Sequence, residues 1–597
     1  MSYTPVWDLD VFFEGGSKSS QFAVYLKETE ELVQQLDKVV SSWEVTSSSS
    51  DIQIILNIID LFGDVSTKLS SSSGYVSCLE AQNTKDTYAK QLNGQLTTLS
   101  AFFSTVIAKF EEKIGKLEEV FFQELLQHDS LKEFQFVLTE IRTRAKESLP
   151  VEMEALIQSL GIDGYHGWSQ LYSSLVASIQ IPFEENGQIE MLSVGQAANK
   201  LSDPDREVRQ KLFHDTEKAW KEKEELFAHA LNHLAGFRLN VYKERGWDEV
   251  LKEPLAINRM QKETLDSMWK AINDSKEHLV KFLQRKAELL GIEKLSWYDV
   301  DAPLVNAPQQ KLSYNEGAEF ILNQFSLFGE QLTAFAKKAF EERWIEAEDR
   351  PNKRPGGFCT GFPMKAQSRI FMTYSGTLNN VSTLAHELGH AFHSYALKDV
   401  HPLNSEYAMN VAETASTFAE MVVSDAAVKL AKTKAEQIAM LEDKIQRSVA
   451  LFMNIQARFL FETKFYEERK NGMVSAARLN ELMTEAQKEA FGDTLDEYHP
   501  LFWASKLHFY ITYVPFYNFP YTFGYLFSLG IYEMALASDG GFEEKYMALL
   551  QDTGRMTVEE LAKKHLDEDL TTTDFWARGV QSCVKDIELF LQLTEEK

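Results

Sequence analysis

Cysteine is scarce in this sequence of 597 residues, in which only Cys78, Cys359 and Cys583 occur, hundreds of residues apart. No CxxC pair is present, which excludes a cysteine-based zinc finger, and so small and odd a count does not suit a disulfide scaffold. The first residues have neither the basic stretch nor the apolar stretch of a secretory signal peptide. We therefore expect a reducing compartment and a cytoplasmic location.

Basic residues are also in deficit. The chain has 61 Lys and Arg against 89 Asp and Glu, which gives a net charge of −28. Such a charge makes a phosphate backbone a poor non-specific partner, and no long run of Lys or Arg indicates a local basic patch. We expect no nucleic-acid partner.

Long hydrophobic runs are missing apart from one uncharged stretch, residues 509–532. Its length meets the criterion for a membrane-spanning helix. It also contains Pro515, Pro520, Asn518 and several tyrosines, which break a helix or carry hydroxyls that would need partners in lipid. We interpret it as a buried, tyrosine-lined wall and expect no membrane association.

Helical periodicity dominates what is present, with apolar residues spaced three and four apart over long segments. The helical pattern lapses around residues 179–195, where a short extended or hairpin element is predicted. Because the chain exceeds what one core usually holds, we expect two or more lobes. The predicted division is an amino-terminal helical lobe at 1–193 and a second, carboxyl-terminal region at 194–597.

A second non-helical segment runs from 350 to 377, where prolines and glycines predict a loop and residues 368–374 predict a strand. The predicted fold class is therefore mainly α, with a small β element beside the next helix. A lone strand there would have a free edge on which an extended peptide could lie.

The helix predicted after this strand contains a His-Glu-x-x-His motif, formed by His386, Glu387 and His390. Residues four apart on a helix project from one face, so the two imidazoles can hold one metal ion. Glu387, offset by about 100°, suits a general base that takes a proton from water. Zn²⁺ brings the pKa of coordinated water to about 7, which peptide hydrolysis at neutral pH requires. The motif predicts a peptidase centre with one Zn²⁺ per chain.

A catalytic zinc ion needs a third protein ligand. The metzincin pattern would place glycine at 393 and histidine at 396, whereas the sequence has His393 and Ala396. The other solution is a glutamate from a following helix, here residues 405–430, with the candidates Glu406, Glu413 and Glu420. Small neighbouring side chains favour Glu413, because they would let two helices approach closely. Glu420, on the same face, could orient a ligand histidine.

Two further features have both a functional and a structural interpretation. His393 shares the face of the two motif histidines, where it could contact substrate, orient a ligand or pack. Residues 508–525 contain one histidine and five tyrosines, which could donate hydrogen bonds to an oxyanion or form an aromatic core segment.

The motif, the segment 410–416 and the run 508–525 together resemble the oligoendopeptidase F branch of the thimet oligopeptidase-like metallopeptidases. The opening Trp7-Asp8-Leu9 and the loop 353–359 are similar to the same branch. The resemblance implies a two-lobed helical fold with a deep central channel that admits oligopeptides and excludes folded proteins.

The resemblance also implies roles for individual residues. His386, His390 and Glu413 would bind zinc, Glu387 would be the base, and a second group would bind substrate and stabilise the oxyanion: His508, Tyr517 and Tyr521. The glycine-rich loop of the thimet-type branch is replaced here by residues 514–520. Tyr510 and Tyr525 therefore remain alternatives for the oxyanion contact.

We accordingly predict a zinc metalloendopeptidase that hydrolyses internal bonds of short oligopeptides. One alternative is an exopeptidase of the same fold, of carboxypeptidase or dipeptidase type. Another is a non-catalytic peptide-binding protein that retains the metal, although an intact Glu387 argues against it. The sequence leaves open the subsite preference, the oligomeric state and the choice of Zn²⁺ over Co²⁺ or Mn²⁺.

Overall fold

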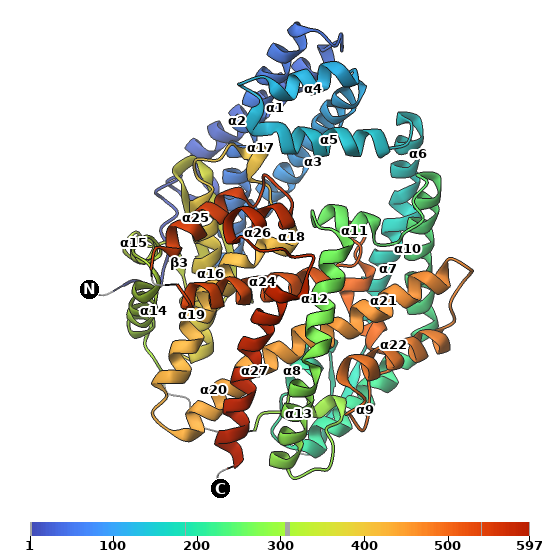
Figure 1. The fold of residues 1–597 in the computed structure, drawn as a ribbon, viewed down its shortest axis with the longest axis vertical. Coiled ribbons are helices and arrows are strands. Elements are labelled where there is room, and N and C mark those ends of the chain that lie inside the picture. Colours follow the sequence, from blue (N-terminus) through green and yellow to red (C-terminus); the bar gives the residue numbers. More distant parts are fainter. Residues whose placement is uncertain (1–2, 186, 305–310, 539, 596–597) are drawn as a thin grey trace. The chain divides into compact units, whose positions relative to one another are not determined.

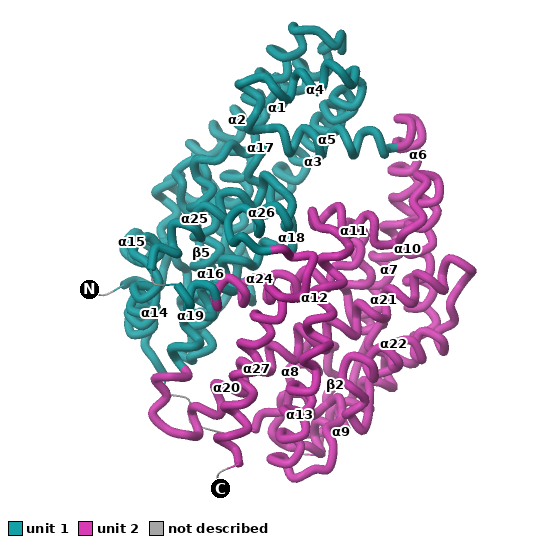
Figure 2. Tube along the Cα trace, viewed as in Figure 1, with its two compact units in different colours: residues 1–148, 309–427, 534–568 teal, residues 149–308, 428–533, 569–597 magenta. Residues whose placement is uncertain are grey.

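The computed structural model describes residues 3–185, 187–304, 311–538 and 540–595, and α-helices make up most of them (Figure 1). Contacts between residues divide the chain into two compact units (Figure 2). Unit 1 comprises residues 1–148, 309–427 and 534–568, and unit 2 comprises 149–308, 428–533 and 569–597. The prediction of a mainly α, two-lobed fold is confirmed. The predicted boundary at 193/194 lies inside unit 2 and stays a prediction of where the peptidase region begins.

Unit 1 contains a three-stranded sheet surrounded by helices. Its strands are β3 (Ile345–Glu346), β4 (Phe358–Phe362) and β5 (Gln367–Phe371). Its helices are α1 (Ser20–Ser42), α2 (Ser49–Gln82), α3 (Thr87–Lys116), α4 (Glu119–Gln127), α5 (Gln135–Glu147), α14 (Tyr314–Phe328), α15 (Glu330–Glu341), α16 (Leu378–Ala396), α17 (Pro402–Ser405), α18 (Met409–Ala412), most of α19 (Thr414–Leu430), α25 (Phe542–Asp552) and α26 (Val558–Leu566).

Unit 2 is helical apart from one hairpin of β1 (Ile181–Glu185) and β2 (Gln188–Leu192). This hairpin confirms the extended element predicted around 179–195, although residue 186 of its predicted turn lies outside the described residues. The helices are α6 (Val151–Gly161), α7 (Gly167–Ala177), α8 (Val194–Lys200), α9 (Arg206–Lys221), α10 (Glu224–Glu244), α11 (Lys252–Ile257), α12 (Lys262–Asp274), α13 (Lys276–Leu290), α20 (Lys434–Val449), α21 (Ile455–Arg469), α22 (Ala476–Phe491), α23 (Phe502–Ser505), most of α24 (Phe519–Leu536) and α27 (Thr573–Glu595).

The uncharged stretch at 509–532 does not form one continuous helix. It contains the end of a 3₁₀ turn (Leu507–Tyr510), a loop and the first part of α24, whose side chains are mostly buried. Among the described helices, none combines the length and the apolar character needed to cross a membrane.

The strand predicted at 368–374 is observed as β5, but the expectation of a lone strand with a free edge was wrong. β5 is the central strand of the order β3-β5-β4, pairing with β3 in parallel and with β4 in antiparallel register. Most prolines and glycines of the preceding segment, which predicted only a loop, lie outside β4, whereas Gly361 lies within it. Pro363 begins the 3₁₀ turn that returns the chain to β5. Since α2 and α16 both pack against β4 and β5, the sheet supports the motif helix.

Helix α16 carries the His-Glu-x-x-His motif and begins at a side-chain cap. Thr377, the N-cap residue, accepts a hydrogen bond from the backbone N–H of Asn380, and the Asn380 side chain accepts one from Thr377. Asn380 thus contributes to the cap from within the first turn of the helix, which begins at Leu378. This reciprocal cap satisfies backbone donors that the first turn leaves without intrahelical partners.

Helices α16 and α19 approach each other closely at Gly389. A Cβ atom added to Gly389 would lie 2.4 Å from the carbonyl oxygen of Ala415 and 2.5 Å from the Cα of Ser416. These neighbours are backbone atoms, which cannot move aside as a flexible side chain can. The missing side chain is therefore what allows the start of α19 to lie against the motif turn of α16.

We expect Gly389→Ala to destabilise the protein by at least about 1–3 kcal/mol, the usual cost of inserting a methyl group into a packed core. It should also lower the metal content, because α16 and α19 must separate and the predicted ligands lie on both sides of this contact. Thermal unfolding and elemental analysis of the purified variant measure the two effects.

The matched control is Gly94→Ala in α3, where an added Cβ meets no atom within 4 Å. Alanine is the better helix former, so this change should raise stability by about 0.5–1 kcal/mol. Equal stability and equal metal content of the two variants would show that α16 and α19 do not depend on a glycine at position 389.

Candidate metal centre

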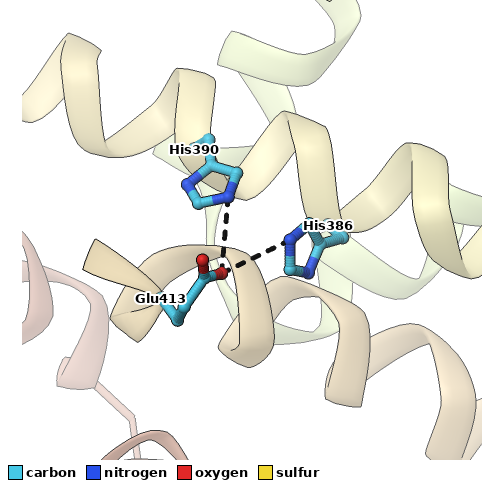
Figure 3. A group of neighbouring side chains, drawn as sticks. All are labelled: His386, His390 and Glu413. Carbon is cyan, nitrogen blue, oxygen red and sulfur yellow. Dashed lines mark ion pairs between the residues drawn. The ribbon is translucent and has the colours of Figure 1, made fainter. Parts of the chain in front are cut away.

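Three predicted ligands lie together in unit 1. Nitrogen and oxygen atoms of His386, His390 and Glu413 lie within 4.8 Å of one another, the spacing of groups that can share one metal ion. The Nε2 atoms of both histidines are 3.4 Å from Oε2 of Glu413. Figure 3 shows the two imidazoles projecting from one helix toward the carboxylate of another segment. Their side chains are 27%, 24% and 28% exposed, so the group faces solvent on one side.

Glu413 reaches the histidines because the chain breaks its helical path there. A single helix over residues 405–430 was predicted, but the structure has separate helices α17, α18 and α19, and Glu413 is the residue between α18 and α19. The Ser416 hydroxyl donates a hydrogen bond to Glu413 Oε2 at 2.7 Å, which holds the carboxylate in place. Glu406, an exposed residue that follows α17, is not part of the ligand group.

Glu420 lies on the other side of the His386 ring from Glu413. Its Oε2 is 3.2 Å from Nδ1 of His386, so the carboxylate can accept the proton of that nitrogen. This hydrogen bond leaves Nε2, the atom that faces Glu413, as the lone-pair nitrogen of the ring. Burial opposes a charge on His386, but the hydrogen bond to Glu420 and the neighbouring carboxylates raise its pKa.

Glu387, the predicted base, is only 7% exposed, and its Oε2 has no hydrogen-bond partner among the described residues. Burial is the main cause that raises the pKa of this carboxyl to about 7, and Glu413 and Glu420 add to it. Gly357, just before β4, lies close enough that an added Cβ would be 3.3 Å from Glu387 Oε1. The base is thus enclosed, while one of its oxygens is left for a proton.

His393 is accounted for by packing. It is fully buried, its ring stacks on Tyr407 at 4.2 Å between centroids, and its Nε2 is 2.9 Å from the Thr553 hydroxyl. Burial lowers its pKa to about 3, so the ring is neutral. It therefore fixes α16 against its neighbours.

A second group of predicted residues lies together in unit 2. The ring centroid of His508 is 5.5 Å from that of Tyr517 and 6.4 Å from that of Tyr521, and the two tyrosines are 5.8 Å apart. We call these three residues the tyrosine cluster. Burial, together with the charges of Arg458 and Lys506, lowers the pKa of His508 to about 4, so its ring is neutral.

The two alternative tyrosines lie in the core of unit 2. Tyr510 is fully buried and stacks on Tyr172 at 3.7 Å between centroids. Tyr525 is 5% exposed, and its hydroxyl lies 3.0 Å from that of Ser448. Neither belongs to the tyrosine cluster, and both have packing partners, although the buried Tyr510 hydroxyl has no hydrogen-bond partner among the described residues.

The loop before Tyr517 contains a backbone outlier. Phe516 has a φ of 52°, which is rare for a bulky residue, and it is buried. Its N–H donates a hydrogen bond of 3.2 Å to Oε1 of Glu462 on α21. The hydrogen bond to this buried acceptor and the ring contacts of Phe516 offset the energetic cost of its backbone conformation. That conformation sets the direction of the side chain of the next residue, Tyr517.

A second anchor holds the same loop four residues earlier. The carbonyl oxygen of Thr512 accepts hydrogen bonds from the Tyr165 hydroxyl at 3.0 Å and from Arg238 Nη2 at 3.3 Å. Sequence reasoning missed Glu462, Arg238 and Tyr165, because each is an ordinary helical residue far along the chain from the loop. The sequence offers a signal for only one of the three: Glu462 is a charged residue on an otherwise apolar helix face.

Two family models match the chain. Residues 200–581 match the family model described as Peptidase family M3, and residues 113–181 match one described as Oligopeptidase F. An oligoendopeptidase F homolog of Lactococcus lactis is 24% identical over 575 residues, covering 95% of this chain and 93% of the relative. Oligopeptidase PepF of Bacillus subtilis is 24% identical over 500 residues, covering 81% and 73%.

Solved structures show the same fold at lower identity. The crystal structure of oligoendopeptidase-F from Enterococcus faecium has a TM-score of 0.70 at 20% identity and covers 96% of this chain and 99% of its own. PZ peptidase A with an inhibitor has a TM-score of 0.72 at 17% identity, covering 94% and 97%.

We expect Glu420→Ala to weaken zinc binding by about 10- to 100-fold, the usual effect of removing the carboxylate that orients a ligand histidine. Competition with a chromophoric chelator measures the dissociation constant. Glu406→Ala, which changes an exposed glutamate outside the ligand group, should leave it unchanged. Equal constants for the Glu420→Ala variant and the unaltered protein would contradict the orienting role.

We expect Glu462→Leu to destabilise unit 2 by about 1–3 kcal/mol, because the buried N–H of Phe516 loses its acceptor. Glu462→Gln keeps an acceptor at the same position and should be far milder. Thermal unfolding of both variants measures the difference, and equal losses would show that the hydrogen bond is not what stabilises the loop.

The same pair predicts a dependence on pH. Burial raises the pKa of Glu462 from 4.5 to about 8, so between these values the folded state retains a proton that the unfolded state has released. The stability that comes from this proton is lost as pH rises toward 8. The unaltered protein should therefore lose stability relative to Glu462→Gln between pH 5 and pH 8, and a constant difference would refute the shift.

Proposed function

Because the chain belongs to peptidase family M3, we propose that it hydrolyses internal bonds of short oligopeptides, with zinc held by His386, His390 and Glu413 and with Glu387 as general base. Membership confirms the resemblance found in the motifs, and peptidase activity toward oligopeptides follows from it. The cleavage of internal bonds is suggested by the names of the oligoendopeptidase relatives. The cytoplasmic location stays a prediction.

The observation that carries the proposal is the group of two imidazoles and one carboxylate beside a buried glutamate whose Oε2 has no hydrogen-bond partner among the described residues. Two nitrogens and one carboxylate oxygen match the donor set of catalytic zinc sites that keep one position open. When bound, the zinc ion acts as a Lewis acid that polarises the scissile carbonyl and makes water acidic enough to attack near neutral pH. Co²⁺ and Mn²⁺ accept the same donors, so the metal has to be identified by analysis.

Glu387 has the properties that a general base needs. Its Oε2 has no hydrogen-bond partner among the described residues, and its pKa is raised toward neutrality. We propose that Oε2 takes the proton of the attacking water and returns it to the leaving amine. Glu387 projects from α16, and Gly357 lies against its other oxygen, Oε1. A carboxylate that first takes up a proton and then releases it has to stay in position between the two steps.

We propose that the tyrosine cluster binds substrate and stabilises the oxyanion. The proposal rests on the family resemblance and on the grouping of three donors in unit 2. His508 is neutral, and its Nδ1 has no hydrogen-bond partner among the described residues, so the ring can donate to a substrate carbonyl. Phenol and imidazole donors of this kind lower the energy of a developing oxyanion.

We expect Glu387→Gln to reduce kcat by about 10²- to 10⁴-fold, because the amide cannot take up the proton of the attacking water. Zinc content and peptide binding should be retained, since the ligands and the carboxamide shape are preserved. Mass spectrometry of products from a defined peptide mixture, with elemental analysis of the enzyme, measures these quantities.

Chelation provides the complementary test. Removing the metal should abolish cleavage, and adding back one equivalent of Zn²⁺ should restore it. Full activity after complete metal removal, or an unimpaired Glu387→Gln enzyme, would overturn the proposal. The latter result would favour the alternative of a non-catalytic metal-retaining protein.

A further inference from the structure

Two positive charges share one aromatic ring beside the tyrosine cluster in unit 2. The guanidinium carbon of Arg458, on α21, is 5.2 Å from the centroid of Phe502, and Nζ of Lys506 is 4.7 Å from it. Arg458 also donates a hydrogen bond of 3.0 Å to Oδ1 of Asn518, the residue after Tyr517. Arg458 and Lys506 both act electrostatically on His508.

Neither cation forms an ion pair with a carboxylate of the described residues. The hydrogen bonds of Arg458 go to neutral amides, Asn454 at 2.9 Å and Asn518, and the Lys506 ammonium has no hydrogen-bond acceptor in the same residues. Burial and the charge of Arg458 lower the pKa of Lys506 to about 8, while Asp301 acts on it more weakly in the opposite direction. Both residues are only partly exposed, and withdrawing charge from water without a counter-charge is costly, so the uncompensated pair needs an explanation.

Elsewhere in unit 2 the same arrangement is completed by the chain itself. Trp247 also has two cations near its ring, Arg245 at 5.1 Å and Lys252 at 4.9 Å. There, both carboxylate oxygens of Glu154 accept hydrogen bonds from Arg245 Nη2, at 2.9 and 3.0 Å. At Phe502 no residue of the described chain supplies such a carboxylate.

A hydrogen-bond donor next to these cations also has no partner. Asn518 is 1% exposed, and its Nδ2 has no hydrogen-bond partner among the described residues. The orientation of this amide is set by Arg458, which donates to Oδ1 and so leaves Nδ2 as the free donor. Buried polar atoms in a native protein are normally paired, so an unpaired donor beside two unpaired cations points to a ligand that carries acceptors and negative charge.

We propose that Lys506 and Arg458, with the Asn518 amide, form a subsite that binds a carboxylate of the peptide substrate. This inference rests on the proposed function, because it takes a peptide as the ligand. A peptide carries a carboxylate at its carboxyl terminus or on an Asp or Glu side chain, and both offer the same two acceptor oxygens to charged donors. A preference for the terminal carboxylate makes cleavage depend on a free carboxyl end.

The test compares three versions of one peptide: the free acid, the carboxyl-terminal amide, and the amide with Glu as its last residue. We expect the unaltered enzyme to cleave the free acid with a kcat/KM about 10- to 100-fold above that of the plain amide, the size of a lost charge-assisted contact. In Lys506→Met, which keeps the length of the side chain without its charge, the ratio should fall to about 1. Lys506→Arg should largely retain it.

Lys252→Met is the matched control, since it removes a cation from the Trp247 ring and should leave the ratio unchanged. If the Glu-ended amide is cleaved as well as the free acid, the subsite accepts a side-chain carboxylate, which supports the shared chemistry. Equal kcat/KM for all three peptides in the unaltered enzyme would overturn the subsite.

Measuring peptide binding without hydrolysis tests the subsite independently of the proposed function. Fluorescently labelled free-acid and amide peptides are titrated into Glu387→Gln enzyme with and without Lys506→Met. Tighter binding of the free acid that Lys506→Met abolishes supports the subsite even if no peptide is hydrolysed, which would refute only the peptidase proposal. Equal binding of both peptides refutes the subsite while leaving zinc-dependent hydrolysis standing.

Discussion

The close contact between α16 and α19 at Gly389 is the constraint on which the candidate metal centre depends. Two imidazoles one turn apart are a property of a single helix, but the third ligand comes from a separate segment that must lie within a few ångströms. A backbone carbonyl and a Cα of α19 occupy the space that a side chain at 389 would fill. The helix break at Glu413 then turns the carboxylate toward both rings, and Ser416 holds it there. One absent methyl group thus decides whether the ligands can meet.

Polar groups left unpaired indicate where the two units have chemistry to perform. In unit 1 the outstanding case is Glu387 Oε2, buried beside the ligands. In unit 2 the cases next to the tyrosine cluster are His508 Nδ1 and Asn518 Nδ2, and the ammonium of the partly exposed Lys506 lies near them without a hydrogen-bond acceptor among the described residues. Burying such groups without partners lowers stability, so their presence is explained by substrate or metal partners more readily than by folding.

The tyrosine cluster shows how a loop can be held without regular secondary structure. Arg238 and Tyr165 bind the carbonyl of Thr512, and Glu462 binds the N–H of Phe516 in its unusual conformation. Both anchors come from helices, which are more rigid than the loop they hold. Hydrogen bonds at Thr512 and at Phe516 therefore hold the loop in its strained conformation. The phenol of Tyr517, the next residue, is thereby held in a defined direction.

The sequence by itself determined the helical class, the β1–β2 hairpin, the position of β5, and the pairing of His386 with His390, because these depend on local periodicity and on spacing within one helix. Glu413 could be favoured from its small neighbours, although the break that positions it was not foreseen. The pairing of β4 with β5 was missed, because glycine and proline at the ends of a short strand look like an uninterrupted loop. Only the tertiary structure decided which distant groups meet: Glu420 at His386, Glu462 at Phe516, and two uncompensated cations at Phe502. Each of these contacts joins residues whose separation along the chain leaves no periodic signal, so the packing of helices was needed to reveal them.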